Sequence, residues 1–329
     1  MKPHLRKDIL SSNWVIISDE RQFRPNEYIS KVKCPFCPGN EEETPPEIYS
    51  LRDKKGWFIR VVPNKYPALL YDDKNFVEEE GINKKNYLNG IHEVIIEDRI
   101  HSIKIHKIKH LVQVLNAYAL RMKELYRRKT IKYVMIFKNY GKNAGASLVH
   151  PHSQIIALPI LPYRIVDEVN HFEYYYKKNK RCAMCDIIKN EIKIKKRVIS
   201  LNDDFIAFAP FASRFNFEIW IAPRKHIINF YELNNYNQLA LIIKDVFYKL
   251  HKSIEGLSYN MIIHSSPRNS KNFHLHIEIL PKLAMPAGFE WGSGFYINTI
   301  SPEKVSEILK SNKKFSLHRR YYENRDSGE

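Results

Sequence analysis

The chain repeats one pattern of cysteines and histidines, and this duplication limits its fold more than any other feature of its 329 residues. Its cysteines fall in two CxxC pairs, Cys34/Cys37 and Cys182/Cys185. Each pair precedes a distant histidine and then a run with alternating histidines, LVHPHSQIIALP or NFHLHIEILP. His101 and His150 stand 49 positions apart, and His226 and His274 stand 48 apart. Such nearly equal spacing indicates an internal duplication.

The segments between these histidines predict the architecture of each copy. The runs LVQVLNAYALRMKELY and QLALIIKDVFYKL have apolar residues at three- and four-residue spacing, which predicts one main helix per copy. Each helix leads to a strand-like run, YVMIF or YNMII. We expect an α+β fold of two tandem units, each an antiparallel sheet with one main helix. The units span 1–162 and 182–329, and the basic, tyrosine-rich segment 163–181 connects them.

The cysteines and histidines predict two metal sites. Two thiolates and two imidazoles form a tetrahedral zinc site, and the repeat supplies this set twice. The sets are Cys34, Cys37, His101 and His150, and Cys182, Cys185, His226 and His274. We expect two structural zinc ions per chain, because four protein ligands leave no position for a reacting water. Unmetallated CxxC turns are the alternative.

Charge and hydropathy limit the location and the partners. The N-terminal sequence has no secretory signal and no run spans a membrane, so we expect a cytoplasmic protein without structural disulfides. The formal net charge of +17 suits nucleic acid or a polyanionic small substrate. Because the lysines are spread along the chain without a nucleic-acid-binding motif, we expect no nucleic-acid partner.

The alternating histidines predict a functional face. On a strand, His150, His152 and Gln154 share one face, as do His274, His276 and Glu278 in the second copy. Burying such groups without partners costs about 1–3 kcal/mol each, so these faces should line a site. Pro151 cannot donate to a ladder, which predicts an edge strand or a bulge.

Two loops are candidates for phosphate binding. Arg21 and Arg24 stand beside Pro25 in a predicted loop, where guanidinium groups can hold a phosphate or simply be solvated. The loop FKNYGKNAGAS (137–147) places Asn139 and Ser147 before the histidine strand. Its backbone amides can cradle a phosphate, although two glycines are also typical of a plain turn.

Taken together, CPFCPGNE, VVPNKYPAL, HEVIIED, FKNYGKNAGASLVHPHSQ and GFEWGSGFYIN resemble the galactose-1-phosphate uridylyltransferase family of the histidine-triad superfamily. The resemblance spans nearly the whole chain and preserves motif order. It implies two tandem histidine-triad-like domains, a homodimer, and ping-pong transfer of a nucleoside monophosphate through a covalent histidine adduct. The substrates it implies are a nucleotide sugar and a sugar 1-phosphate.

The resemblance also implies roles for single residues. His152 matches the nucleophile, and Gln154 matches the residue that hydrogen-bonds the transferred phosphoryl group. Phe36 and Asn64 match positions around the nucleoside. The remaining matches are contacts to the nucleotide and its phosphates, namely Asn139, Ser147, Arg21 and Arg24. His276 is the rival nucleophile from the second copy, but it lacks the preceding FKN and AGAS sequences.

Two departures from the family pattern affect the substrate. Lys65 stands where the best-known branch has an acidic residue near the ribose. The C-terminal segment GFEWGSGFYIN, called the tail below, lacks the tyrosine–glutamate pair that recognises the hexose in that branch. We expect a UDP-glucose:hexose-1-phosphate uridylyltransferase of galactose metabolism. Adenylyl transfer by an ADP-glucose or dinucleoside-polyphosphate phosphorylase is the alternative with the same chemistry. A zinc-containing nucleotide- or nucleic-acid-binding protein is the non-catalytic alternative.

Overall fold

The computed structural model describes residues 2–11, 13–28, 33–70, 76–87, 89–268 and 270–315. Within them the chain is α+β with antiparallel sheets, as the sequence predicts. The strands form one sheet of ten and one of four, rather than one separate sheet for each copy of the repeat. The large sheet has the order β10 (Val198–Leu201), β11 (Phe205–Phe208), β12 (Ile219–Pro223), β14 (His276–Pro281), β13 (Tyr259–His264), β8 (Tyr133–Tyr140), β9 (His152–Leu158), β7 (Ile91–Ile96), β4 (Gly56–Pro63) and β3 (Tyr49–Asp53).

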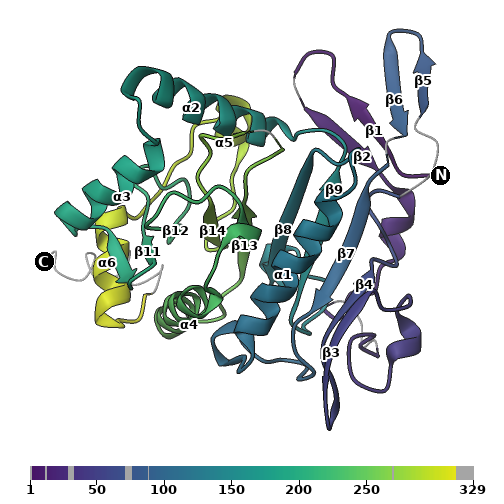
Figure 1. The fold of residues 1–329 in the computed structure, drawn as a ribbon, viewed down its shortest axis with the longest axis horizontal. Coiled ribbons are helices and arrows are strands. Elements are labelled where there is room, and N and C mark those ends of the chain that lie inside the picture. The colour runs from purple at the N-terminus through teal and green to yellow at the C-terminus, as the bar shows by residue number, and fades with distance from the viewer. Residues whose placement is uncertain are drawn as a thin grey trace, which may run out of the picture.

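The two halves of the chain share this large sheet. In Figure 1 the strands of the first half lie to the right and those of the second half to the left. They join where β13 pairs with β8, with Tyr259 opposite Tyr140 and Ile263 opposite Ile136. The segment 163–181 contains helix α2 (Tyr163–Asn179), and α3 (Ala183–Ile194) begins directly after Cys182. The two halves of the chain are therefore joined by the backbone hydrogen bonds between β13 and β8.

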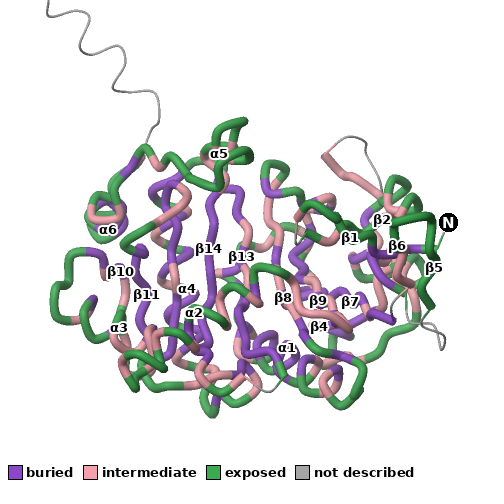
Figure 2. Tube along the Cα trace, turned by 90° about the horizontal axis from the view of Figure 1, so that it is seen from above, coloured by how far each residue is buried: buried purple, intermediate pink, exposed green. Residues whose placement is uncertain are grey.

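The main core lies between the sheet and two helices, α1 (Leu111–Tyr126) and α4 (Tyr236–Ser253). Helix α1 has the bounds of its predicted run, and α4 extends two residues before and three residues beyond its run, 238–250. In α1 this spacing buries Val114, Leu115 and Tyr118. Figure 2 shows the continuous buried zone along the central strands. Because strand side chains alternate, the opposite face of the sheet is free for other contacts.

That opposite face differs between the two halves. In the second half it packs against α2 and α3 through Phe172, Met184 and Ile188. In the first half it carries a small apolar cluster in which Phe36 and Leu148, from loops, pack with side chains of β4 and β7. No described helix packs in this first-half cluster, so a ligand can approach the sheet there.

The rest of the fold surrounds this sheet. A small sheet has the order β2 (Trp14–Ile17), β1 (His4–Lys7), β6 (Asn83–Tyr87) and β5 (Phe76–Glu80). The other helices are α5 (Gly288–Ser293) and α6 (Pro302–Ser311), with 3-10 turns η1 (Asp19–Phe23), η2 (Glu41–Glu43), η3 (Ile105–Lys107), η4 (Lys142–Ala144) and η5 (Phe230–Glu232). None of the helices in the described ranges combines the length and apolar character that a membrane span needs.

The edge-strand prediction for LVHPHSQ is wrong. Strand β9 lies inside the sheet, between β7 and β8. Pro151 is compatible with this position because it precedes the first ladder residue, His152, so its missing N–H removes no ladder bond. Its carbonyl accepts a hydrogen bond from the Glu97 amide at 3.0 Å.

Candidate active site and metal centres

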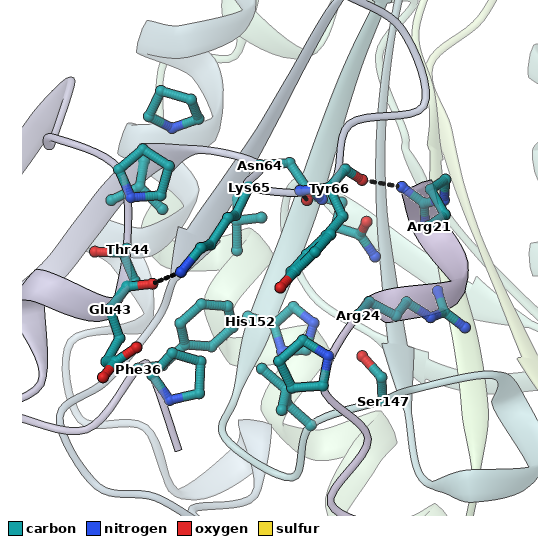
Figure 3. Close-up of a pocket in the computed structure, with 18 of the residues that line it drawn as sticks. Arg21, Arg24, Phe36, Glu43, Thr44, Asn64, Lys65, Tyr66, Ser147 and His152 are labelled. Atoms are coloured by element: carbon teal, nitrogen blue, oxygen red, sulfur yellow. Dashed lines mark hydrogen bonds between the residues drawn. The ribbon is translucent and has the colours of Figure 1, made fainter. Parts of the chain in front are cut away.

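A cavity of about 190 Å³ opens on the helix-free face of the first half. His152 and Gln154, at the start of β9, line it from the sheet, as alternation on one strand face predicts. In Figure 3 His152 lies between Phe36 on one side and Arg24 and Ser147 on the other. The sequence-predicted residues that line this cavity are Arg21, Arg24, Phe36, Asn64, Ser147, His152 and Gln154.

The imidazole of His152 is held in one tautomer. Its Nδ1 lies 2.8 Å from the carbonyl oxygen of His150, and a carbonyl can only accept, so Nδ1 carries the proton. Burial lowers the pKa of His152, which keeps the ring neutral. Phe36 packs against the ring edge, with ring centroids 5.3 Å apart. The unprotonated Nε2 is therefore the nitrogen available to attack a substrate in the cavity.

Gln154 is oriented by a histidine that the sequence analysis did not single out. The backbone amide of Ala68 donates to His92 Nδ1 at 3.0 Å, so Nε2 of the neutral His92 ring is a donor. Burial lowers the pKa of His92 to about 4, consistent with a neutral ring. His92 Nε2 then donates to Gln154 Oε1 at 2.9 Å. This contact fixes the amide and leaves the Gln154 NH₂ group as a donor toward the cavity.

Among the residues that the structure describes, four cationic side chains line the cavity: Arg21, Arg24, Lys33 and Lys65. Arg21 is anchored by a 2.6 Å bond from Nη1 to the Tyr66 carbonyl, and Lys65 donates to the Glu43 carbonyl at 3.2 Å (Figure 3). Among the described residues Arg24 has no side-chain hydrogen bond or ion pair, so its guanidinium is free to meet an anion. This excess of positive charge suits a phosphorylated ligand.

Glu27, which sequence reasoning also missed, attaches the arginine segment to the loop before the histidine strand. Its amide donates to the Ser147 carbonyl at 2.8 Å, and its Oε2 accepts from the Val149 amide at 2.6 Å. This places Arg24 and Ser147 on the same side of the cavity (Figure 3). The only sequence signal for Glu27 is its position three residues after Arg24.

Asn139 lies outside the set of described residues that line the cavity. Its Oδ1 accepts from Asn260 Nδ2 at 2.8 Å across the β8–β13 junction, and the same Asn260 group donates to the Ala144 carbonyl. Asn139 therefore supports the loop that carries Ser147. The loop needs glycine at 141, where φ is +85° and a Cβ atom would come within 2.2 Å of Ser258 Oγ.

The first cysteine–histidine set comes together as predicted. The ligand atoms of Cys34, Cys37, His101 and His150 lie within 4.8 Å of one another. Cys37 Sγ is 3.3 Å from His101 Nδ1 and 3.6 Å from His150 Nδ1, near the spacing of about 3.5 Å expected around a tetrahedral zinc ion. His150 Nε2 donates to the Asp98 carbonyl at 2.7 Å, which leaves the Nδ1 lone pair toward the metal position.

The second set repeats this geometry. The ligand atoms of Cys182, Cys185, His226 and His274 also lie within 4.8 Å of one another. His274 Nδ1 is 3.5 Å from Cys182 Sγ and 3.6 Å from Cys185 Sγ, and its Nε2 donates to the Pro223 carbonyl at 3.0 Å. Both clusters thus have the donor set and orienting hydrogen bonds of a metal site.

His276, the counterpart of His152, lies in a different environment. Its Nδ1 also bonds a backbone carbonyl, that of His274, at 3.0 Å. However, its ring stacks on His264 at 4.6 Å and packs against Trp220 at 5.3 Å. Glu168, His264 and His276 form a further group of metal-ligand type that the sequence analysis did not predict, because Glu168 comes from α2. His264 is itself paired with Glu168 at 3.0 Å.

Comparison with known proteins identifies the family. The chain is 34% identical to ADP-glucose phosphorylase of Arabidopsis thaliana, over 94% of this chain and 92% of the relative. It is 31% identical to galactose-1-phosphate uridylyltransferase of Thermotoga maritima, over 93% of this chain and 97% of the relative. The chain belongs to the galactose-1-phosphate uridylyltransferase family. The resemblance of its motifs to this branch of the histidine-triad superfamily is thereby confirmed.

Two further comparisons cover most of the chain. A solved structure titled "Structure of uridylyltransferase" superposes with a TM-score of 0.82 at 27% identity, covering 94% of this chain and 98% of that one. A family described as a domain of unknown function, DUF4921, matches residues 53–320. The chain is therefore a nucleotidyltransferase of this family. The relatives include both uridylyltransferases and an ADP-glucose phosphorylase, so the family by itself leaves the nucleotide open.

Proposed function

We propose that the protein transfers a nucleoside monophosphate from a nucleotide sugar to an acceptor phosphate through a covalent nucleotidyl-His152. The observation that carries this proposal is a neutral imidazole, with Nε2 unprotonated, in a cavity that four cations line. The donor we favour is UDP-glucose and the acceptor a hexose 1-phosphate. Phe36, Asn64 and Ser147 match nucleotide-contacting positions of the uridylyltransferases, and all three line this cavity, which supports the choice.

The reaction then has two displacements. His152 Nε2 attacks the α-phosphorus of the nucleotide sugar, a P–N bond forms, and the bond to the bridging oxygen breaks. The sugar 1-phosphate leaves with that electron pair. In the second step a phosphate oxygen of the acceptor attacks the same phosphorus and restores the free imidazole. The covalent adduct divides one difficult displacement into two easier ones.

The surrounding side chains position the phosphates and balance their charge. Arg21 and Arg24 face the diphosphate, while the Gln154 NH₂ group donates to an oxygen of the transferred phosphoryl group. Donors that are already aligned stabilise charge that develops in phosphoryl transfer. The first Cys2His2 set would hold a structural zinc ion that fixes His150, two residues from the nucleophile.

Mass spectrometry of the protein after separate incubation with UDP-glucose and ADP-glucose tests the proposal. We expect the mass of one nucleoside monophosphate to be added, on His152. Salt-dependent binding of mixed RNA or DNA, with no adduct from either nucleotide sugar, would instead support the nucleic-acid-binding alternative.

Lys65 predicts relaxed substrate choice. A lysine donates but cannot accept from a ribose hydroxyl as a carboxylate does. Here its Nζ contacts only the Glu43 carbonyl among the described residues. We therefore expect a uridine nucleotide to be accepted with weak discrimination of the sugar and the base, because strong discrimination needs fully paired polar groups.

A competition between UDP-glucose and ADP-glucose measures this discrimination, with galactose 1-phosphate, glucose 1-phosphate and inorganic phosphate as acceptors. We expect UDP-glucose to be used with a hexose 1-phosphate. The second candidate is ADP-glucose phosphorolysis, which the 34% identity to ADP-glucose phosphorylase favours. A strong preference for ADP-glucose with phosphate as the best acceptor would establish that activity instead.

Gln154→Met provides a test of phosphoryl stabilisation. The substitution keeps the volume and removes the amide donor, so kcat should fall by about 100- to 1000-fold, or about 3–4 kcal/mol. The adduct should still form, because His152 is intact. We would measure kcat by product release and the adduct by mass. An unchanged kcat would exclude Gln154 as a phosphoryl donor.

We also propose that the protein is a homodimer, as the resemblance implies. The tail around α5 exposes large apolar side chains, among them Phe289, Trp291 and Phe295. Clustered exposed apolar residues are typical of protein–protein interfaces. No residue of the tail lines the cavity of its own chain among the described residues.

A further inference from the structure

A buried ion pair lies under the catalytic strand, on the face of the sheet opposite the cavity. Lys138 Nζ donates to Glu97 Oε2 at 2.6 Å, and the two side chains are 1% and 0% exposed. The other carboxylate oxygen of Glu97 accepts from Ser153 Oγ at 2.5 Å and from Tyr118 Oη at 2.5 Å. Tyr118 comes from α1, so the group lies at the edge of the main core.

This ion pair reaches the nucleophile through the backbone. Lys138 Nζ also donates to the carbonyl oxygen of His152 at 3.1 Å. The ladder between β8 and β9 ends at the pair Phe137–Gln154, so the ammonium bonds this carbonyl just beyond the last ladder pair. Ser153, the next residue, is held by Glu97. Both the backbone of His152 and its neighbour are therefore fixed from beneath.

The second copy shows that the fold does not require this arrangement. Its pair Ile262–Glu278 corresponds to Phe137–Gln154, because Glu278 occupies the place of Gln154 in the repeated strand. One position further, the second copy pairs Ile263 with Ile277 in the apolar core. The first copy has Lys138 and Ser153 at this position. At this position, on the helix-covered face, the second copy therefore packs without a charged pair.

Stability also fails to explain the ion pair. Removing two charges from water is costly, and a buried pair is often replaced by apolar residues without loss of stability. Burial by itself raises the pKa of Glu97, but Lys138 and the hydroxyl donors bring it below its ordinary value, so the carboxylate is ionised. Charged hydrogen bonds are shorter and stronger than neutral ones, which suits a group that must hold a backbone segment still.

We propose that Lys138 and Glu97 are positioning residues that set the attack geometry of His152 from the opposite face of the sheet. The inference rests on the proposed function of His152. A misplacement of the reacting atoms by about 1 Å can slow a reaction by about 100-fold. Neither Lys138 nor Glu97 is among the described residues that line the cavity, so neither contacts a substrate bound there. The pair therefore controls the rate of adduct formation rather than the affinity for the nucleotide sugar.

The test compares two charge-removing double variants. Lys138→Met with Glu97→Gln removes the pair under His152. The control, Arg197→Met with Glu191→Gln, removes a buried ion pair at 2.6 Å in the second half, together with the contact of Arg197 to Glu303 at 2.7 Å. The nucleotide sugar is the one that labels the wild-type protein, UDP-glucose or ADP-glucose. Single-turnover labelling at a series of its concentrations gives the maximal rate and the half-saturating concentration. Zinc content and unfolding temperature are measured on the same samples.

We expect the maximal labelling rate of the Lys138/Glu97 variant to be about 10- to 100-fold lower than that of the wild type. Its half-saturating concentration should stay within twofold of the wild-type value. The control variant should be labelled at the wild-type rate. Equal rates in the two double variants would overturn the inference, as would a change confined to the half-saturating concentration. If the double variant does not fold, Ser153→Ala replaces it, because this substitution removes one hydrogen bond to Glu97. Ser153→Ala should slow labelling several-fold. An unchanged labelling rate would overturn the inference. A wild-type protein that is never labelled overturns the proposed function itself, and this inference with it.

Discussion

The His152→Ala protein is expected to form no nucleotidyl adduct and to lose turnover by about ten-thousand-fold or more, because loss of a nucleophile eliminates the covalent intermediate. Mass spectrometry after incubation with a nucleotide sugar measures the adduct, and product release measures turnover. The substitution lies on a strand that is paired on both sides, so the fold should survive.

His276→Ala is the matched control. His276 has the same position in the second copy and the same bond from Nδ1 to a backbone carbonyl, but its ring stacks on His264 and packs against Trp220. We expect this variant to be labelled like the wild type, with some loss of stability because a buried ring is removed. Labelling of His152→Ala together with none of His276→Ala would reverse the assignment of the two copies.

The second large effect concerns metal. We expect about two zinc ions per chain in freshly purified protein, and about one in Cys34→Ser, because a ligand of the first cluster is lost. Structural zinc contributes about 10 kcal/mol or more of binding free energy in small peptides, comparable with the about 5–15 kcal/mol that stabilises a whole domain. The unfolding temperature of Cys34→Ser should therefore fall sharply, and its activity should follow the folded fraction.

Metal analysis and thermal unfolding, each with and without a chelator, measure these effects. Cys182→Ser is the comparison for the second cluster, and it should lose one zinc ion while the cavity residues keep their positions. Well under one zinc ion per chain in the wild type would remove the zinc assignment. An unchanged unfolding temperature for Cys34→Ser would show that the first cluster does not stabilise the fold.

The sequence by itself determined the fold class, the two ligand sets and the face of the histidine strand. Each of these follows from a short-range or repeated regularity. Alternation along a strand sends His152 and Gln154 to one side, and the 3.6-residue period defines α1 and α4. The equal spacing in the two copies assigned the distant histidines to the same ligand set as each CxxC pair, and the structure places the members of each set together. Motif order then predicted the family.

Only the tertiary structure decided which residues support the site. His92, Glu27, Glu97 and Lys138 each act through a partner between 14 and 122 positions away, and no local pattern records such a distance. The strand order was equally hidden: Pro151 suggested an edge, but it stands one residue before the ladder and β9 lies inside the sheet. Strand neighbours are chosen by packing across the whole core, so a residue's sequence context fixes the face it occupies but not the groups that it meets there.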